Sequence, residues 1–364
     1  MKKTLFTILS LLLIFGCSKE PINYETKLVE RHGVKYLPNS DEPYSGPVFC
    51  SFDDGKTRVE GTLNDGKKDG KWTSWYGTGQ KDGEETWKDR LSTWWYKNGQ
   101  KCTEETYKDG ELDGLSTYWY KNGQKCTEET YKDGELDGLS TYWDENGQKL
   151  IEETYKNGEF DGLSTWWYED GQKWMEETYK DGELISEKHW DENGQKDWEQ
   201  TYKNGEFDGL STWWYENGQK WTEETYKDGK QDGLCTEWYE NGQKWTEETY
   251  KNGELDGLST SWHENGQKEY ETTYKDGELD GLWTYWDEDG QKLIEETYKD
   301  GELDGLSTYW DENGQKLIEE TYKNGEFDGL STSWHENGQK EYETTYKDGK
   351  IITEKHWDKD GNKK

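Results

Sequence analysis

The sequence has little of what usually builds a globular core. Apolar residues make up 28% of its 364 residues, charged residues make up 35%, and the mean hydropathy is -1.39. A chain this polar cannot enclose the thick aliphatic core of an ordinary globular domain. Basic charge is scarce as well, because 45 Lys and Arg stand against 81 Asp and Glu and leave a formal net charge of -36. This balance argues against nucleic-acid binding through phosphates and against adsorption to anionic lipid.

Aromatic residues are what the sequence has in excess. The 23 Trp, 26 Tyr and 7 Phe account for 15% of the chain, whereas disordered chains have few aromatic residues. Because each Trp or Tyr buries a large area, we expect a folded protein whose core is aromatic and thin. The acidic surface of such a protein favours solubility and also cationic partners or divalent ions.

The longest apolar run is too short to span a membrane as a helix. It covers residues 4–15, about twelve residues, follows a short basic start and ends at Gly16-Cys17. The Gly-Cys pair resembles a bacterial lipobox. The resemblance implies that residues 1–16 are a lipoprotein signal peptide used by the Sec pathway, and that Cys17 carries the lipid. Ser18, in place of Asp, then implies a protein of the cell envelope at the outer membrane. The alternative is an ordinary signal peptide with an incidental cysteine.

One unit recurs along most of the chain. It begins at Tyr107 and returns every 24 residues, except for a step of 23 between Tyr179 and Tyr202 and a shortened unit of 20 that begins at Trp87. Such a period is typical of repeat proteins in which each unit packs only on its neighbours. The expected organisation is a signal peptide at 1–16, a tether at 17–36, an atypical N-terminal capping repeat at 37–62, tandem repeats at 63–357 and a tail at 358–364.

Each unit has the pattern of a β-hairpin. Residues 115–120 form a run of β-branched and aromatic type, and residues 125–131 form the return strand. Asn122-Gly123 between them predicts a type I′ turn, which needs positive φ at both central residues. We therefore expect an all-β fold, an elongated array of antiparallel hairpins in a single-layer sheet.

The turn fixes which side chains share a face. With Asn122-Gly123 as the loop, Leu115 faces Thr130, Thr117 faces Glu128, and Trp119 faces position 126, so these residues share one face. The recurring Trp on this structural face predicts a ladder of indole rings. The ladder consists of Trp75, Trp95, Trp119, Trp143, Trp167, Trp214, Trp238, Trp262, Trp286, Trp310 and Trp334, with Trp190 and Trp357 in two atypical units. Because a Glu recurs on the same face, that face cannot be dry, and the carboxylate must meet water or a cation.

The opposite face varies most between copies and is the predicted binding face. Its residues at the position of Tyr118 are aromatic or acidic in most repeats. The candidates for partner binding are Tyr118, Tyr142, Trp166, Trp213, Tyr285 and Tyr309.

Two units depart from the pattern in the same way. Residues 185–190 closely match residues 352–357, which end the array. A unit of terminal type inside the stack indicates duplication of a block of repeats and predicts a seam near residues 183–190.

The segments 113–124 and 69–76 resemble the MORN-repeat variant, whose pattern is roughly Asp-Gly, an aromatic residue, Trp-Tyr and Asn-Gly-Gln. The resemblance covers residues 63–357 and implies an elongated sheet of hairpins that serves as a protein or lipid interaction scaffold. Proteins of this kind are often labelled YwqK-type antitoxins. Family units usually carry Trp where most copies here have a residue such as Ser116, and Trp72 and Trp283 keep it.

The sequence contains no pattern that predicts catalysis. The five His are scattered without metal-ligand spacing, and no nucleophile has a plausible base, so we expect no enzyme, no cofactor and no metal. Cys102 and Cys126 hold the same place in adjacent hairpins, about 9.6 Å apart, which predicts free thiols. Segments such as 287–290 have turn chemistry and not that of a calcium loop.

The leading interpretation is therefore a binding scaffold displayed at the envelope. Its expected partner is a protein or another envelope component, with membrane contact through the lipid only. Two alternatives stay open: an antitoxin or immunity-type protein that neutralises a toxin, and a repeat protein that binds glycans or choline by stacking and cation–π contact.

Overall fold

The computed structural model describes residues 19–87 and 91–364. The predicted signal peptide and Cys17 lie outside the described residues. Contacts between residues divide the chain into two units, residues 1–149 and 150–364, which we describe one at a time. Within the described ranges, no helix has the length and apolar character needed to cross a bilayer.

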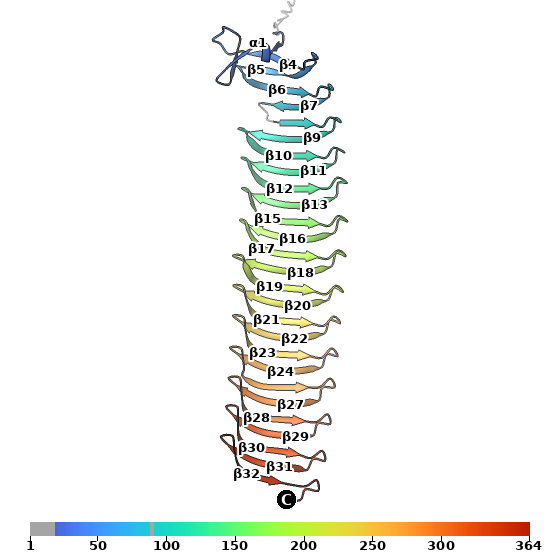
Figure 1. Ribbon diagram of the computed structural model, residues 1–364, viewed down its shortest axis with the longest axis vertical. Helices are drawn as coiled ribbons and strands as arrows, with labels where there is room; N and C mark the ends of the chain where they lie inside the picture. The colour runs from blue at the N-terminus through green and yellow to red at the C-terminus, as the bar shows by residue number, and fades with distance from the viewer. Residues whose placement is uncertain (1–18, 88–90) are drawn as a thin grey trace, which may run out of the picture. The chain divides into compact units, whose positions relative to one another are not determined.

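Over residues 19–87 and 91–149, the first unit contains one short helix and a sheet of antiparallel strands that follow one another in chain order from β4 to β12 (Figure 1). Its elements are β1 (Ile22–Asn23), α1 (Tyr24–Lys27), β2 (Val29–Arg31), β3 (Val34–Tyr36), β4 (Gly46–Ser51), β5 (Thr57–Asn64), β6 (Lys67–Trp75), β7 (Lys81–Thr86), β8 (Leu91–Trp95), β9 (Lys101–Lys108), β10 (Glu111–Trp119), β11 (Lys125–Lys132) and β12 (Glu135–Trp143).

The second unit is built from strands that belong to one sheet, and each hairpin pairs with the next along the chain. From β13 onward the strands are β13 (Lys149–Lys156), β14 (Glu159–Phe160), β15 (Gly162–Trp167), β16 (Lys173–Lys180), β17 (Glu183–Trp190), β18 (Lys196–Lys203), β19 (Glu206–Trp214), β20 (Lys220–Lys227), β21 (Lys230–Trp238), β22 (Lys244–Lys251), β23 (Glu254–Trp262), β24 (Lys268–Lys275), β25 (Glu278–Leu279), β26 (Gly281–Trp286), β27 (Lys292–Lys299), β28 (Glu302–Trp310), β29 (Lys316–Lys323), β30 (Glu326–Trp334), β31 (Lys340–Lys347) and β32 (Lys350–His356). The predicted fold class, an all-β array of tandem antiparallel hairpins, is confirmed.

The two kinds of turn differ from the prediction. Asp109 and Gly110 have φ of 53° and 95° and join the paired residues Lys108 and Glu111, so the type I′ turn lies here. At the other end the Gly123 amide donates to the Tyr120 carbonyl at 2.9 Å, and Gly123 has a φ of 89°. Asn122 is not among the described residues with positive φ. This is a type I turn closed by a glycine bulge, and the prediction of a type I′ turn at Asn122-Gly123 is wrong.

The bulge also changes the predicted register next to the turn. Leu115 pairs with Thr130 and Thr117 pairs with Glu128, as predicted. The register then shifts, and Trp119 pairs with Lys125 instead of residue 126. Because a bulge places two residues opposite one, the alternation of side chains is reset at this point.

The N-terminal region of the first unit has an apolar core. Leu28, Tyr44, Val48, Leu63 and Trp72 are buried together, and β1 pairs in parallel with the outer edge of β4. A covered edge cannot recruit another strand. The prediction of a tether over 17–36 is therefore wrong for residues 22–36. These residues fold against the hairpin formed by β4 and β5 and supply Leu28 to its core.

The ends of the second unit and its atypical hairpin are also ordered. Strand β17 pairs with β16 and with β18, so the hydrogen-bonded ladder continues through the seam predicted near residues 183–190. The predicted tail is not loose, because Trp357 forms a bridge with Lys363 and residues 358–362 make a turn of the repeat type.

Candidate binding surfaces

The repeats present two different faces, which we name by their side chains. The leucine face, the predicted structural face, carries the positions of Leu115, Thr117 and Trp119. The tyrosine face, the predicted binding face, carries the positions of Ser116 and Tyr118. Ser116 is 0% exposed and Thr117 is 4% exposed, so the middle of each strand is buried on both faces by small polar side chains.

A lysine on the leucine face links each Trp of the ladder to a carboxylate. Lys101 Nζ lies 5.3 Å from the ring centroid of Trp119 and 2.6 Å from Oε2 of Glu104. This is the cation that the recurring Glu of this face was expected to need, and the lysine chain also covers the indole. The lysine-to-ring contact recurs at 4.9 to 5.9 Å for Trp95, Trp119, Trp143, Trp190, Trp214, Trp238, Trp262, Trp286, Trp310, Trp334 and Trp357.

A row of leucines along the same face is half exposed. The leucines at the position of Leu115 are 42 to 50% exposed in ten hairpins: Leu91, Leu115, Leu139, Leu163, Leu210, Leu234, Leu258, Leu282, Leu306 and Leu330. In the atypical hairpin Ser186 holds the position of these leucines. It pairs with Thr178 from one side, and Leu163 of the preceding hairpin pairs with Thr178 from the other. Sequence reasoning missed this row, because it assigned the whole face a structural role.

On the tyrosine face, hydroxyl groups surround a recurring glutamate. The Tyr118 hydroxyl donates to Oε1 of Glu105 at 2.8 Å, and the Tyr107 hydroxyl donates to Oε2 of the same carboxylate at 2.9 Å. Burial, together with the hydrogen bond to Glu105, raises the pKa of Tyr107 to about 12. The neutral hydroxyl is therefore fixed as a donor, and the cluster links the neighbouring strands β9 and β10.

The predicted binding residues all lie on this face and are half-buried. Tyr118, Tyr142 and Tyr309 donate hydroxyl groups to glutamates of the preceding strand. Trp213 stacks on Trp198 with 5.5 Å between ring centroids. Trp166 pairs across the sheet with Ile151 and Met175, and the Tyr285 ring is nearly parallel to that of Trp283 at 6.1 Å. The structure places the six in equivalent positions of separate hairpins and does not gather them into one pocket.

An aromatic cluster surrounds the atypical hairpin on the tyrosine face. The His189 ring stacks on Trp198 at 3.9 Å and meets the edge of Trp174 at 5.8 Å. Trp221 contacts Trp213 and is 43% exposed, so the cluster reaches the surface. The sequence predicted the positions of Trp174 and Trp221 to lie on the leucine face, because alternation alone does not reveal the bulge beside the turn.

Cysteine and acidic residues have structural surroundings. Cys50, Cys102, Cys126 and Cys235 are free, and burial raises the pKa of the Cys235 thiol to about 12. Asp287 accepts hydrogen bonds from the amides of Asp289 and Gln291 at 3.0 and 2.8 Å, as a turn residue does. Across the described part of the chain, no three His, Cys, Asp or Glu side chains are grouped so as to hold a metal ion.

Comparison with protein families identifies the repeat. The model described as MORN repeat variant matches eleven segments of this chain and leaves out residues 182–206, which contain the atypical hairpin. The matched segments are 68–89, 91–109, 112–133, 136–157, 160–181, 207–228, 231–252, 255–276, 279–300, 303–324 and 327–348.

Comparison with individual proteins gives only distant similarity. The crystal structure of TcdB2-TccC3 is 11% identical, with a TM-score of 0.15, and the match covers 90% of this chain and 19% of that chain. TcdB2-TccC3-Cdc42 is 10% identical, with a TM-score of 0.18, and the match covers 91% of this chain and 22% of that chain. The Photorhabdus luminescens Tc holotoxin pore is 12% identical, with a TM-score of 0.14, and the match covers 87% of this chain and 18% of that chain. The chain thus spans about a fifth of these proteins, and no curated protein matches it.

Proposed function

Because the chain belongs to the MORN repeat variant family, we propose that it is a non-catalytic repeat scaffold that binds a protein partner along its leucine face. We further propose that a lipid on Cys17 holds it at the cell envelope. The support for the second part is the Gly16-Cys17 pair that follows a short apolar run.

The half-exposed row of leucines is the observation that carries the partner proposal. Ten equivalent leucines keep 42 to 50% of their surface in contact with solvent, although the chain is otherwise strongly acidic. Within each of the two units, successive members of the row are two strands apart, about 9.6 Å. A partner with apolar side chains at that spacing and basic residues between them would match both the row and the net charge of -36. Repetition would add avidity to weak single contacts.

The tyrosine face supports this choice by its internal bonding. The hydroxyl groups of Tyr118 and Tyr142 are bonded to glutamates of the same sheet and are less available to a partner. On this proposal the tyrosine face stiffens the array, whereas the leucine face is open to contact.

Site-specific crosslinking from the full-length protein tests the partner proposal. A photoreactive residue replaces Leu258, which is 48% exposed, and in a matched variant it replaces the exposed turn residue Glu264. We expect the Leu258 and Leu282 variants to crosslink the same protein in the producing cells and the Glu264 variant not to. Equal crosslinking from all three positions, or none from the leucines, would contradict the proposal.

Membrane fractionation tests the anchor. The substitution Cys17→Ser should move the protein from the membrane pellet to the soluble fraction and abolish incorporation of labelled fatty acid. Retention in the pellet without the cysteine would contradict lipid anchoring, and it would leave the crosslinking result unaffected.

The identity of the crosslinked protein also separates the alternatives. A toxin captured through Leu258 would favour the antitoxin or immunity hypothesis. Retention of the protein on a glycan or choline resin, with no protein captured, would favour the third hypothesis.

A further inference from the structure

Most regular repeats place an apolar side chain between two tyrosines on the tyrosine face, and Gln231 is the polar exception. Phe160 lies between Tyr155 and Tyr179, with ring centroids 4.6 and 4.8 Å away. Phe327 lies between Tyr322 and Tyr346 at 4.5 and 4.8 Å. The same place is taken by Leu112 in the first regular repeat, where it pairs with Tyr107. We call this residue the filler.

The shortened repeat lacks, in its sequence, the residues that carry the filler in a regular repeat. Trp87 and Leu91 correspond to Tyr107 and Leu115, but only three residues separate them where a regular repeat has seven. Trp87 and Tyr107 hold the places of the two tyrosines that enclose a filler, two strand spacings or about 9.6 Å apart. That distance leaves room for one flat group between the rings.

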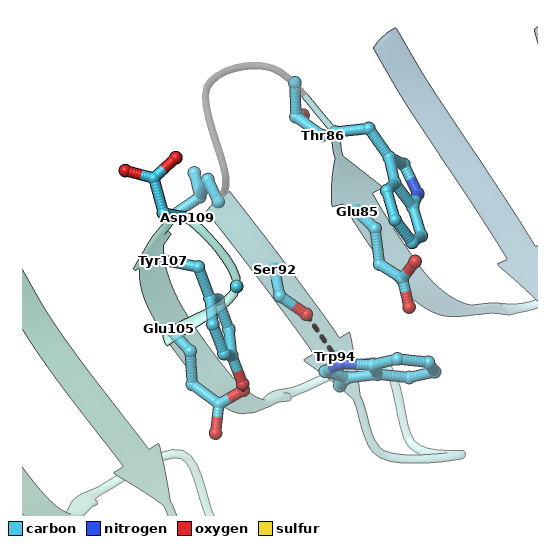
Figure 2. A pocket seen from close by; sticks show the side chains of 10 residues that line it. Glu85, Thr86, Ser92, Trp94, Glu105, Tyr107 and Asp109 are labelled. Carbon is cyan, nitrogen blue, oxygen red and sulfur yellow. Dashed lines mark hydrogen bonds between the residues drawn. The ribbon is translucent and has the colours of Figure 1, made fainter. Parts of the chain in front are cut away.

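The structure has an open slot at this place. Its volume is about 520 Å³, and its lining includes Trp87, Leu91, Trp94 and Tyr107. In Figure 2, Tyr107 stands along one side and Glu85 along the other, with Trp94 at the lower end. The Trp94 ring is held in place by its Nε1–H, which donates to Ser92 Oγ at 2.8 Å. Trp87 is 49% exposed, so the slot is accessible.

Three acidic residues line the aromatic slot, namely Glu85, Glu105 and Asp109. Glu105 accepts hydrogen bonds from the hydroxyls of Tyr107 and Tyr118. Glu85 holds the place of Glu105 one hairpin earlier. The places of the two tyrosines that donate to Glu105 are taken next to Glu85 by Trp87 and Trp94, which have no hydroxyl group. Lys68 Nζ lies 3.6 Å from Oε2 of Glu85 and 5.1 Å from the centroid of the Trp87 ring.

We propose that this slot binds a small organic cation with a flat apolar body, such as an arylalkylammonium ion. The flat group takes the place of the missing filler between Trp87 and Tyr107. The ammonium lies toward the carboxylates of Glu85 and Glu105, where electron-rich ring faces add cation–π attraction. An anion of the same shape meets the two carboxylates and the strongly negative field of the whole chain.

Binding of three probes to the full-length protein tests the chemistry. We expect phenethylammonium to bind at one equivalent by calorimetry, hydrocinnamate to bind at least about tenfold more weakly, and ethylammonium, which lacks the ring, to bind about as weakly. Equal binding of hydrocinnamate would overturn the role of charge. Equal binding of ethylammonium would overturn the role of the aromatic slot, and no binding of phenethylammonium would overturn the proposal as a whole.

A variant that restores the regular repeat tests the location. Replacing Arg90 by the five residues Gly-Glu-Leu-Asp-Gly gives this unit the length and filler of its neighbours. We expect it to lose phenethylammonium binding by about tenfold or more, with circular dichroism unchanged. The matched control carries Gly-Glu-Ala-Asp-Gly, which restores the length without a large filler and should bind as the parent protein does.

A charge variant completes the test. Glu85→Gln should weaken phenethylammonium roughly threefold to tenfold and leave the weak binding of hydrocinnamate unchanged or slightly stronger. Undiminished phenethylammonium binding in both the leucine-containing insertion and Glu85→Gln would place the ligand elsewhere and overturn the assignment. The crosslinking test of the leucine face does not depend on any of these results.

Discussion

The N-terminal region and the hairpin repeats solve the same packing problem in different ways. Around β4, β5 and β6, burial is apolar and involves Leu28, Val48 and Trp72. In the repeats, the most deeply buried side chains are small and polar, as Ser116 and Thr117 illustrate. The repeats are therefore held by backbone ladders, tyrosine–glutamate hydrogen bonds and lysine–indole contacts. The apolar core is concentrated where the first unit covers the edge of its sheet with β1.

One position shows the difference most clearly. Trp72 and Ser116 hold the same position in their hairpins. Each contacts the strand that precedes its own strand in the chain. A Cβ on Gly61 would come within 2.3 Å of the Trp72 ring, so any residue larger than glycine at position 61 would clash with this ring. Ser116 instead pairs with Glu105, whose carboxylate needs the space. The comparison indicates that a large residue at the position of Ser116 goes with a small residue at the position of Glu105, and the reverse.

Alkaline pH should produce the largest effect and should act on the repeats. Burial raises the pKa of Tyr107 to about 12, and hydrogen bonding with Cys102 and Cys126, together with burial, raises the pKa of Tyr96 and Tyr120 to about 12. An unfolded tyrosine has a pKa of about 10. A raised folded pKa means that the contribution to stability is complete below about pH 10 and is lost as the pH rises toward 12. We expect cooperative loss of the β-sheet signal in that window.

Absorbance of tyrosinate together with circular dichroism measures this transition. Most tyrosines should ionise only as the sheet unfolds, in one step above pH 10. Independent ionisation of the tyrosines near pH 10 in a sheet that stays folded would show that burial and hydrogen bonding of the tyrosine hydroxyls contribute little to stability. Because lysines also lose charge in this range, the tyrosine signal itself must be followed.

Removal of a buried indole should have the next largest effect, and it should be confined to the N-terminal region. Trp72→Ala should cost about 3–5 kcal/mol of local stability, because a full side chain is lost from a core and its Nε1–H no longer bonds to the Thr62 carbonyl. The matched variant Trp238→Ala, in the half-exposed ladder, should cost about 1–2 kcal/mol. Hydrogen exchange resolved along the full-length chain compares the two. Equal losses would remove the distinction between the two regions.

Transplanting the N-terminal arrangement into a repeat should have an intermediate effect. Ser140 is 0% exposed and pairs with Glu129, so Ser140→Trp should cost about 1–3 kcal/mol by overpacking. The additional change Glu129→Gly copies the Gly61 and Trp72 pair and should recover part of that loss. Thermal unfolding of the two single variants and the double variant gives the coupling. A strictly additive result would contradict paired exchange.

Sequence reasoning found the hairpin repeat and the pairing of Leu115 with Thr130, because period and residue type are local properties. It chose the wrong dipeptide for the type I′ turn, since Asn-Gly and Asp-Gly both tolerate positive φ. The choice depends on how many residues separate the paired strand ends. The bulge at Trp119 inserts a residue that alternation cannot reveal.

Other features depend on contacts distant in the chain. Leu28 belongs to a core only because β1 pairs with β4, and its own segment is too polar and short to predict this. The shortened unit at Trp87 is visible in the spacing, but the open slot needs the stacked neighbours of Phe160 and Phe327 for its interpretation. The leucine row was visible as a pattern, and only its exposure required coordinates.

The lysine of the ladder should give the smallest effect. Lys244 Nζ lies 5.5 Å from the Trp262 ring and is paired with the Glu247 carboxylate, and both side chains are partly exposed. Lys244→Met keeps the apolar stem over the indole and removes the charge, so it should cost only about 0.2–1 kcal/mol. A double-mutant cycle with Glu247→Gln should give a coupling of similar size that shrinks at high salt, because an exposed ion pair is screened. A coupling of several kcal/mol, or one that does not change with salt, would mean that the repeats rely on charge as the N-terminal region relies on apolar burial.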